Sequence, residues 1–97
     1  MARFISLLNW TDQGIRNAKE TINRAQAARK AFESAGGKMV DVYWTIGQYD
    51  VVVIFDAPDS DTAYRLMLAT GMQGNVHTIT MPALDEQAMA KILQGIS

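Results

Sequence analysis

Three side chains in this sequence have chemical types that suit proton transfer. His77 is the one histidine, and an unperturbed imidazole titrates near neutrality. Asp50 ends the turn Gly47-Gln48-Tyr49-Asp50, where its carboxylate would suit a general base. The phenol of Tyr43 is a third proton-transfer group. His77, Tyr43 and Asp50 are therefore the candidate catalytic residues.

Each of the polar candidates also has a structural interpretation. A single histidine supports no multi-histidine metal site, and His77 can be an ordinary strand residue or, alternatively, a haem ligand or a base. An aspartate beside a glycine turn commonly accepts hydrogen bonds from backbone N–H groups. Gly47, Tyr49 and Asp50 would then preserve the geometry of the turn. We expect no metal site and no cofactor.

Length and composition exclude several classes of protein. The chain has 97 residues, which is the size of a single domain spanning 1–97. Its net charge of −1 argues against a nucleic-acid partner, and the absence of cysteine excludes disulfides and thiol nucleophiles. No apolar run approaches the roughly 18 residues that span a bilayer, and no signal peptide is recognisable. We expect a cytoplasmic protein without membrane contact.

Alternating helix and strand patterns predict the elements that position these side chains. Residues 5–8 indicate a short strand, and 11–35 a long helix with a possible break at Glu20-Thr21. The apolar runs 39–46 and 51–56 flank the glycine turn and predict a hairpin. The segment Pro58-Asp59-Ser60-Asp61 opens a second helix that stops at Gly71, residues 76–81 form a fourth strand, and Asp85 caps a last helix.

This order predicts an α+β fold of the ferredoxin-like type, β-α-β-β-α-β with a C-terminal helix. Both main helices should cover one face of a four-stranded antiparallel sheet. We assign the following residues to the covered face: Ile5, Leu7, Val40, Val42, Ile46, Ile79 and Met81. We assign a second set to the open face: Phe4, Ser6, Leu8, Trp10, Tyr43, Thr45, Thr78 and Thr80. His77 would point away from the open face.

Several separated motifs make the chain resemble the GYD-domain family. They are the run from Leu8 to Arg16, Gly36-Gly37-Lys38, Val42-Tyr43, Gly47-Gln48-Tyr49-Asp50-Val51-Val52, Pro58-Asp59 and Gly74-Asn75-Val76. The family signature, Gly-x-Tyr-Asp, is met by Gly47, Tyr49 and Asp50. The resemblance implies a small bacterial or archaeal protein of the dimeric α/β-barrel superfamily. It transfers no catalytic residues, because the family carries no agreed activity.

Three functions follow as hypotheses. The first is a homo-oligomer, built on a homodimer, that binds a small molecule in a cavity between facing sheets. Its ligand-binding residues would be Ser6, Trp10, Tyr43, Thr45 and Thr78. The second is a cofactor-independent oxygenase- or isomerase-type enzyme acting on a small aromatic or quinone-like substrate. The third is a purely structural oligomer whose sheets pack without a cavity.

Overall fold

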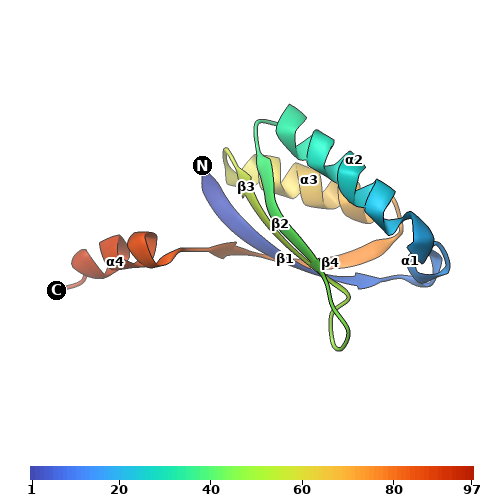
Figure 1. Cartoon of the computed structure of the whole chain (residues 1–97). Coiled ribbons are helices and arrows are strands. Elements are labelled where there is room, and N and C mark those ends of the chain that lie inside the picture. The colour runs from blue at the N-terminus through green and yellow to red at the C-terminus, as the bar shows by residue number, and fades with distance from the viewer.

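The computed structural model describes all 97 residues and confirms the predicted fold class (Figure 1). The elements in chain order are β1 (Ala2–Trp10), α1 (Asp12–Arg16), the 3-10 helix η1 (Ala18–Glu20), α2 (Thr21–Ser34), β2 (Lys38–Trp44), β3 (Val51–Ala57), α3 (Ser60–Met72), β4 (Val76–Ala83) and α4 (Glu86–Gln94). The four strands form one antiparallel sheet in the order β2-β3-β1-β4. Helices α2 and α3 cover one of its faces.

Side-chain caps begin three of the helices, each within the segment that the sequence predicted as a helix start. Thr11 accepts a hydrogen bond from the backbone N–H of Gly14 at 3.0 Å and starts α1. Asp59 accepts from the backbone N–H of Thr62 at the start of α3, and Asp85 accepts from that of Ala88 at the start of α4, each at 2.8 Å. Each cap satisfies an N–H group that has no partner within its own helix.

The long predicted helix is divided into three pieces. A short α1 ends at Arg16, η1 follows, and α2 begins at Thr21, so the predicted break lies where the sequence placed it. Thr21 does not cap the new helix; its hydroxyl instead accepts a hydrogen bond from the indole N–H of Trp44 at 2.9 Å. Gly36, with φ of +84°, follows the end of α2 in the left-handed conformation that glycine favours.

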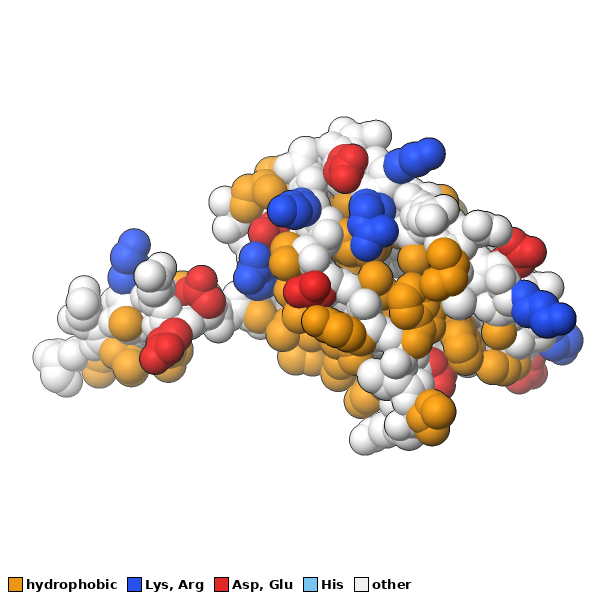
Figure 2. All heavy atoms as spheres, in the orientation of Figure 1, with side chains coloured by type: hydrophobic (Ala, Val, Ile, Leu, Met, Phe, Trp, Pro, Cys, Tyr) orange, Lys and Arg blue, Asp and Glu red, His pale blue; other side chains and the backbone are white.

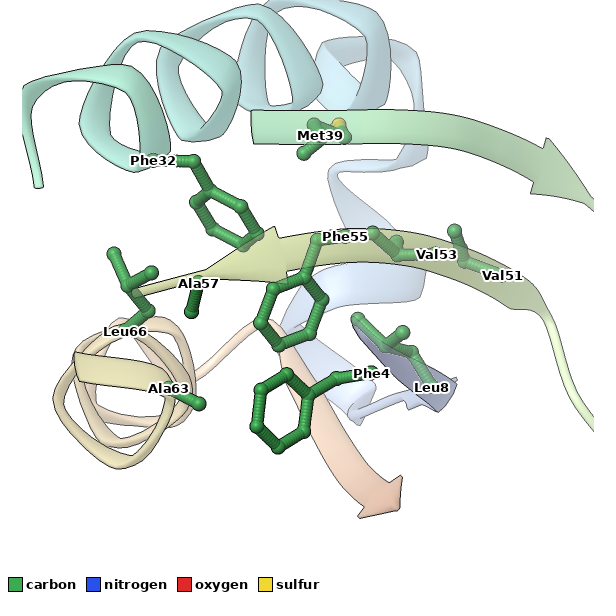
Figure 3. Packing of buried hydrophobic residues seen from close by; sticks show 10 residues of the cluster. All are labelled: Phe4, Leu8, Phe32, Met39, Val51, Val53, Phe55, Ala57, Ala63 and Leu66. Carbon is green, nitrogen blue, oxygen red and sulfur yellow. The ribbon is translucent and has the colours of Figure 1, made fainter. Parts of the chain in front are cut away.

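The core lies between the sheet and the two covering helices. Phe55 on β3 is fully buried, stacks on Phe4 of β1 with ring centroids 5.3 Å apart, and meets the ring of Phe32 from α2 edge-on at 5.0 Å (Figure 3). Offset-stacked and edge-on ring pairs are the favoured aromatic geometries. Seven further side chains complete this cluster: Leu8, Met39, Val51, Val53, Ala57, Ala63 and Leu66.

The predicted assignment of strand residues to the two faces is wrong for β1 and β4. Phe4, Ser6 and Leu8 are buried under the helices, and the strand register places Thr80, Thr78 and Val76 beside Ser6, Leu8 and Trp10 on that same face. Ile5, Leu7, Ile79 and Met81 lie instead on the open face. His77 lies there too, opposite Asn9.

Some assignments on β2, the first strand of the hairpin, are correct. Tyr43 lies on the open face and Val42 packs against the core, as predicted. A register shift between Met39 and Asp41 accommodates Val40 as an irregular position. Thr45 and Ile46 belong to neither face, because β2 ends at Trp44 and both residues lie in the connecting loop.

The hydroxyl groups of β1 and β4 explain the reversal. Ser6 is fully buried, yet its hydroxyl is 2.6 Å from that of Thr80 and also donates to the sulfur of Met67 at 3.2 Å. The free-energy cost of burying a hydroxyl group is largely offset when the group forms a hydrogen bond within the protein. Polar type was therefore a poor guide to the side on which these residues lie.

Helix α4 extends away from the body of the molecule (Figure 1). None of its residues is buried. Its large apolar side chains recur three or four positions apart, the spacing of one helix face: Met89, Ile92, Leu93 and Ile96, the last lying just beyond the helix. All four side chains are exposed.

Candidate functional site

The open face of the sheet carries two apolar rows that run across the strands. One row contains Val52, Leu7 and Ile79, and it begins at Tyr43 on the β2 edge. The other contains Ile54, Ile5 and Met81, and it begins at Asp41. Side chains paired across antiparallel strands point to the same side of the sheet. Six aliphatic side chains thus form one continuous patch, which we call the open-face patch.

Polar groups border the open-face patch at both ends. At one end Arg3 on β1 and Asp56 on β3 form a two-pronged ion pair, with N–O distances of 2.9 and 3.2 Å. The hydrogen bond from Arg3 lowers the pKa of Asp56, and the carboxylate raises the pKa of the guanidinium. At the other end are Asn9 and His77. An apolar patch with a polar border is typical of a docking surface.

A second feature is a cavity on the opposite face, between the sheet, α2 and α3. Its volume is about 230 Å³, and 16 of its 22 lining residues are hydrophobic. The cavity exists because α2 presents small side chains there, Ala25, Ala28 and Ala31, instead of larger ones. A smaller share of its wall is polar, and Arg24 on α2 carries the one positive charge among the lining residues.

The predicted ligand-binding residues are dispersed among different surfaces. Ser6 and Trp10 line the cavity beneath the helices. Thr78 lines a second hollow of about 380 Å³ between α3 and β4, with Tyr64 and Leu68. Tyr43 lies on the open face and Thr45 in the β2–β3 loop. No single cavity brings the five together, so a shared role in one ligand site stays a prediction.

The candidate catalytic residues are also separated. Tyr43 lies on the edge strand β2 and His77 on the opposite edge strand β4, three strand intervals apart, or roughly 14 Å. The carboxylate of Asp50 is engaged with the backbone, because its Oδ2 accepts a hydrogen bond from the N–H of Trp10 at 2.9 Å. The structure does not assemble the three into one reacting geometry, and catalysis by any of them stays a prediction.

Residues 4–93 match the family model of the GYD domain, which is nearly the whole chain. The chain belongs to the GYD-domain family. The resemblance inferred from the separated motifs is thereby confirmed.

The signature of this GYD domain has a clear structural role. Gly47 has a φ of +137°, which side chains strongly disfavour. The loop then returns so that the N–H of Asp50 donates to the carbonyl of Leu8 at 2.9 Å, and the N–H of Thr45 donates to the carbonyl of Asp50 at 2.8 Å. The carboxylate of Asp50 accepts a hydrogen bond from the backbone N–H of Trp10, as the structural interpretation of this residue expects.

A second family motif joins the start of α1 to the loop before β4. The backbone N–H of Thr11 donates to the carbonyl of Asn75 at 3.0 Å, and its hydroxyl donates to the carbonyl of Gly74 at 2.5 Å. A Cβ atom on Gly14 would lie 1.9 Å from the carbonyl oxygen of Asn75. Only glycine permits so close an approach of the two backbones. The sequence placed Gly74 in a family motif but did not predict this contact.

This GYD domain is similar to a named protein of Thermus thermophilus, the glutamine synthetase and cystathionine beta-lyase binding protein. The two are 32% identical over 85 residues, which cover 87% of this chain and 90% of the relative. The name of that relative describes binding to two enzymes.

Two further features complete the description of the site. No three histidine, aspartate or glutamate side chains of this GYD domain come close enough together to hold a metal ion. None of its helices combines the length and apolar character needed to cross a bilayer.

Proposed function

We propose that this GYD domain is a homo-oligomeric binding protein that pairs with a second copy through the open-face patch. The observation that carries this proposal is the reversed polarity of the edge strand β4. Thr78 and Thr80 face the helices, whereas Ile79 and Met81 face outward and are 53% and 38% exposed. In a lone domain that arrangement leaves apolar surface in water while it buries hydroxyls.

A second copy supplies the cover that the patch lacks. A twofold interface brings the same surface of two subunits together, so an apolar patch is complementary to itself. Arg3 and Asp56 neutralise each other within one subunit. Facing copies therefore do not bring unpaired charges together at that end of the patch. Figure 2 shows hydrophobic atoms along the lower side of both the body and the C-terminal arm.

The oligomeric state of matched variants tests this proposal. We expect sedimentation velocity at micromolar concentration to give a dimer or larger assembly for the wild type. Ile79→Lys should give a monomer, because it places an unpaired charge within the apolar interface. Ile22→Lys is the matched control, since Ile22 is similarly exposed at 51% but lies on α2. A monomeric wild type, or equal dissociation of both variants, would contradict the proposal.

We also propose that this assembly binds enzymes, as the name of the Thermus thermophilus relative describes for that protein. The unpartnered apolar face of α4 supports a protein partner, since such a face is typical of helices that dock in grooves. The test is biolayer interferometry with purified glutamine synthetase and purified cystathionine beta-lyase. We expect binding to be lost in Ile92→Asp and kept in Gln87→Asp, an exposed polar position on the same helix. Equal binding by both variants would exclude α4 as the docking element.

Small-molecule binding is a second candidate function, and the cavity beneath the helices favours it. This hollow is partly open to solvent, has a volume of about 230 Å³ and is lined mostly by hydrophobic side chains with a few polar ones, which is the usual make-up of a small-molecule site. Strand β1 turns Ser6 and Trp10 toward the helices, where both line this cavity. The cavity is therefore a better candidate ligand site than a space between facing sheets. Native mass spectrometry of protein purified from its own cells tests this function. An extra mass that is released on denaturation would support it.

A further inference from the structure

The walls of the cavity beneath the helices are suited to a flat apolar ligand. The indole rings of Trp10 and Trp44 line it, together with aliphatic side chains such as Leu66 and Val53. An apolar cavity of about 150 Å³ can hold benzene. At about 230 Å³ this cavity therefore has room for an aromatic ring with a short substituent.

Most polar side chains in the cavity wall already have partners within the protein. The hydroxyl of Ser6 bonds to Thr80, and that of Thr21 accepts from Trp44. The hydroxyl of Thr70 donates to the carbonyl of Leu66 at 2.8 Å, and the amide oxygen of Asn75 accepts from Gln13 at 2.9 Å. Each of these groups thus has at least one hydrogen-bond partner within the protein.

Arg24 is the one charged residue among those that line the cavity. It is half-buried, and its guanidinium donates only to backbone carbonyls, those of Asn17 at 2.9 Å and Gly14 at 3.5 Å. A guanidinium has five N–H donors, so three are unused. The ion pair found in this chain joins Arg3 to Asp56, and no carboxylate neutralises Arg24. Arg24 is therefore a cation among the residues that line an apolar cavity, and it has no ion-pair partner in the chain.

We propose that this cavity binds a small apolar monocarboxylate, with its ring or short chain among the indoles and alanines and its carboxylate on the guanidinium of Arg24. Guanidinium and carboxylate form strong paired hydrogen bonds. The anion supplies the charge partner that the protein lacks, and the apolar body fills the space left by the alanines of α2. This proposal rests on the second candidate function and adds the chemical class of the ligand.

Phenylacetate and its neutral isostere phenylacetamide are the probes. The two share their ring and shape and differ in charge, so isothermal titration of both isolates the contribution of the carboxylate. We expect the wild type to bind phenylacetate at least about tenfold more tightly than the amide, which corresponds to about 1.4 kcal/mol. Arg24→Gln should remove this preference. Lys30→Gln, an exposed cation on the same helix, should keep it.

Ala28→Leu locates the site, because its larger side chain fills the cavity. We expect it to bind neither probe while its melting temperature stays at or above that of the wild type. Unchanged binding in this variant would place the site elsewhere and overturn the proposal. Equal affinity of the wild type for both probes would overturn the carboxylate class alone and leave small-molecule binding standing. A wild type that binds neither probe would overturn the monocarboxylate proposal, whereas the second candidate function would fail only if native mass spectrometry found no released mass.

Discussion

The carboxylate of Asp50 accepts a hydrogen bond from the backbone N–H of Trp10 at 2.9 Å. The pairing of β1 with β3 ends at Leu8 and Val51, so Trp10 lies beyond the last paired residue of β3. Asp50 extends the ladder by one step, because its own N–H also donates to Leu8. The family signature thus fixes the β2–β3 loop to the central strand.

Replacing this carboxylate should destabilise the fold. We expect Asp50→Ala to lower the free energy of unfolding by about 1–3 kcal/mol, because it leaves a partly buried N–H without its charged acceptor. Asp50→Asn keeps an acceptor and should lose less. Urea denaturation measures both, with the exposed Glu33→Ala as a control that should stay within about 0.5 kcal/mol of the wild type. An Asp50→Ala protein of wild-type stability would show that the hydrogen bond is dispensable.

Gly14→Ala should separate α1 from the loop before β4. Its new Cβ would lie 1.9 Å from the carbonyl oxygen of Asn75, so one backbone must move. We expect a loss of about 2–3 kcal/mol in the free energy of unfolding, as for other overpacked sites. Gly71→Ala is the control: it has open space around it within α3, and alanine should raise helix stability by up to about 1 kcal/mol. Similar losses in both variants would contradict the close approach.

Amides of α4 should exchange rapidly with solvent when the protein is monomeric. The helix has nine residues and buries none of them, and isolated helices shorter than about 12 residues are marginal in water. Hydrogen exchange followed by mass spectrometry on Ile79→Lys should therefore find β1 and β3 protected and α4 close to the unfolded rate. Protection of α4 equal to that of β3 in this monomer would mean that the arm needs no partner to be stable.

The ion pair of Arg3 with Asp56 should make stability depend on acid pH. The hydrogen bond from Arg3 lowers the pKa of Asp56 from its ordinary value of 3.8, so the folded state favours the ionised form. The resulting stabilisation is fully present above the unfolded pKa and is lost as the pH falls through the lowered folded value. Arg3→Gln removes it.

Unfolding curves of the wild type and Arg3→Gln at several pH values measure this effect. We expect the difference in the free energy of unfolding to be constant above about pH 5 and to vanish in stronger acid. Asp59, whose pKa is lowered by its hydrogen bonds from Thr62, is common to both proteins, so its own acid loss cancels in the difference. If the stability difference between the wild type and Arg3→Gln grew as the pH fell, the ion pair would not lower the pKa of Asp56 in the folded state.

Local signals in the sequence determined the element order, the helix caps and the role of the glycine turn. Thr11, Asp59 and Asp85 satisfy N–H groups within three residues of themselves, and Gly36 and Gly47 meet backbone demands of their own positions. Such signals depend on neighbouring residues alone. They therefore needed no knowledge of the packing.

Only the tertiary structure decided which side of β1 and β4 faces the helices. Residues 4–8 are apolar on both sides apart from Ser6, so alternation could not choose between them. The choice was made by long-range pairing: Phe4 stacks on Phe55, and the hydroxyl of Ser6 meets that of Thr80 from a strand more than 70 residues later. The same packing turned Ile79 and His77 outward and left Arg24 beside a cavity. These placements depend on contacts between segments that are far apart in the sequence, and local sequence patterns cannot predict such contacts.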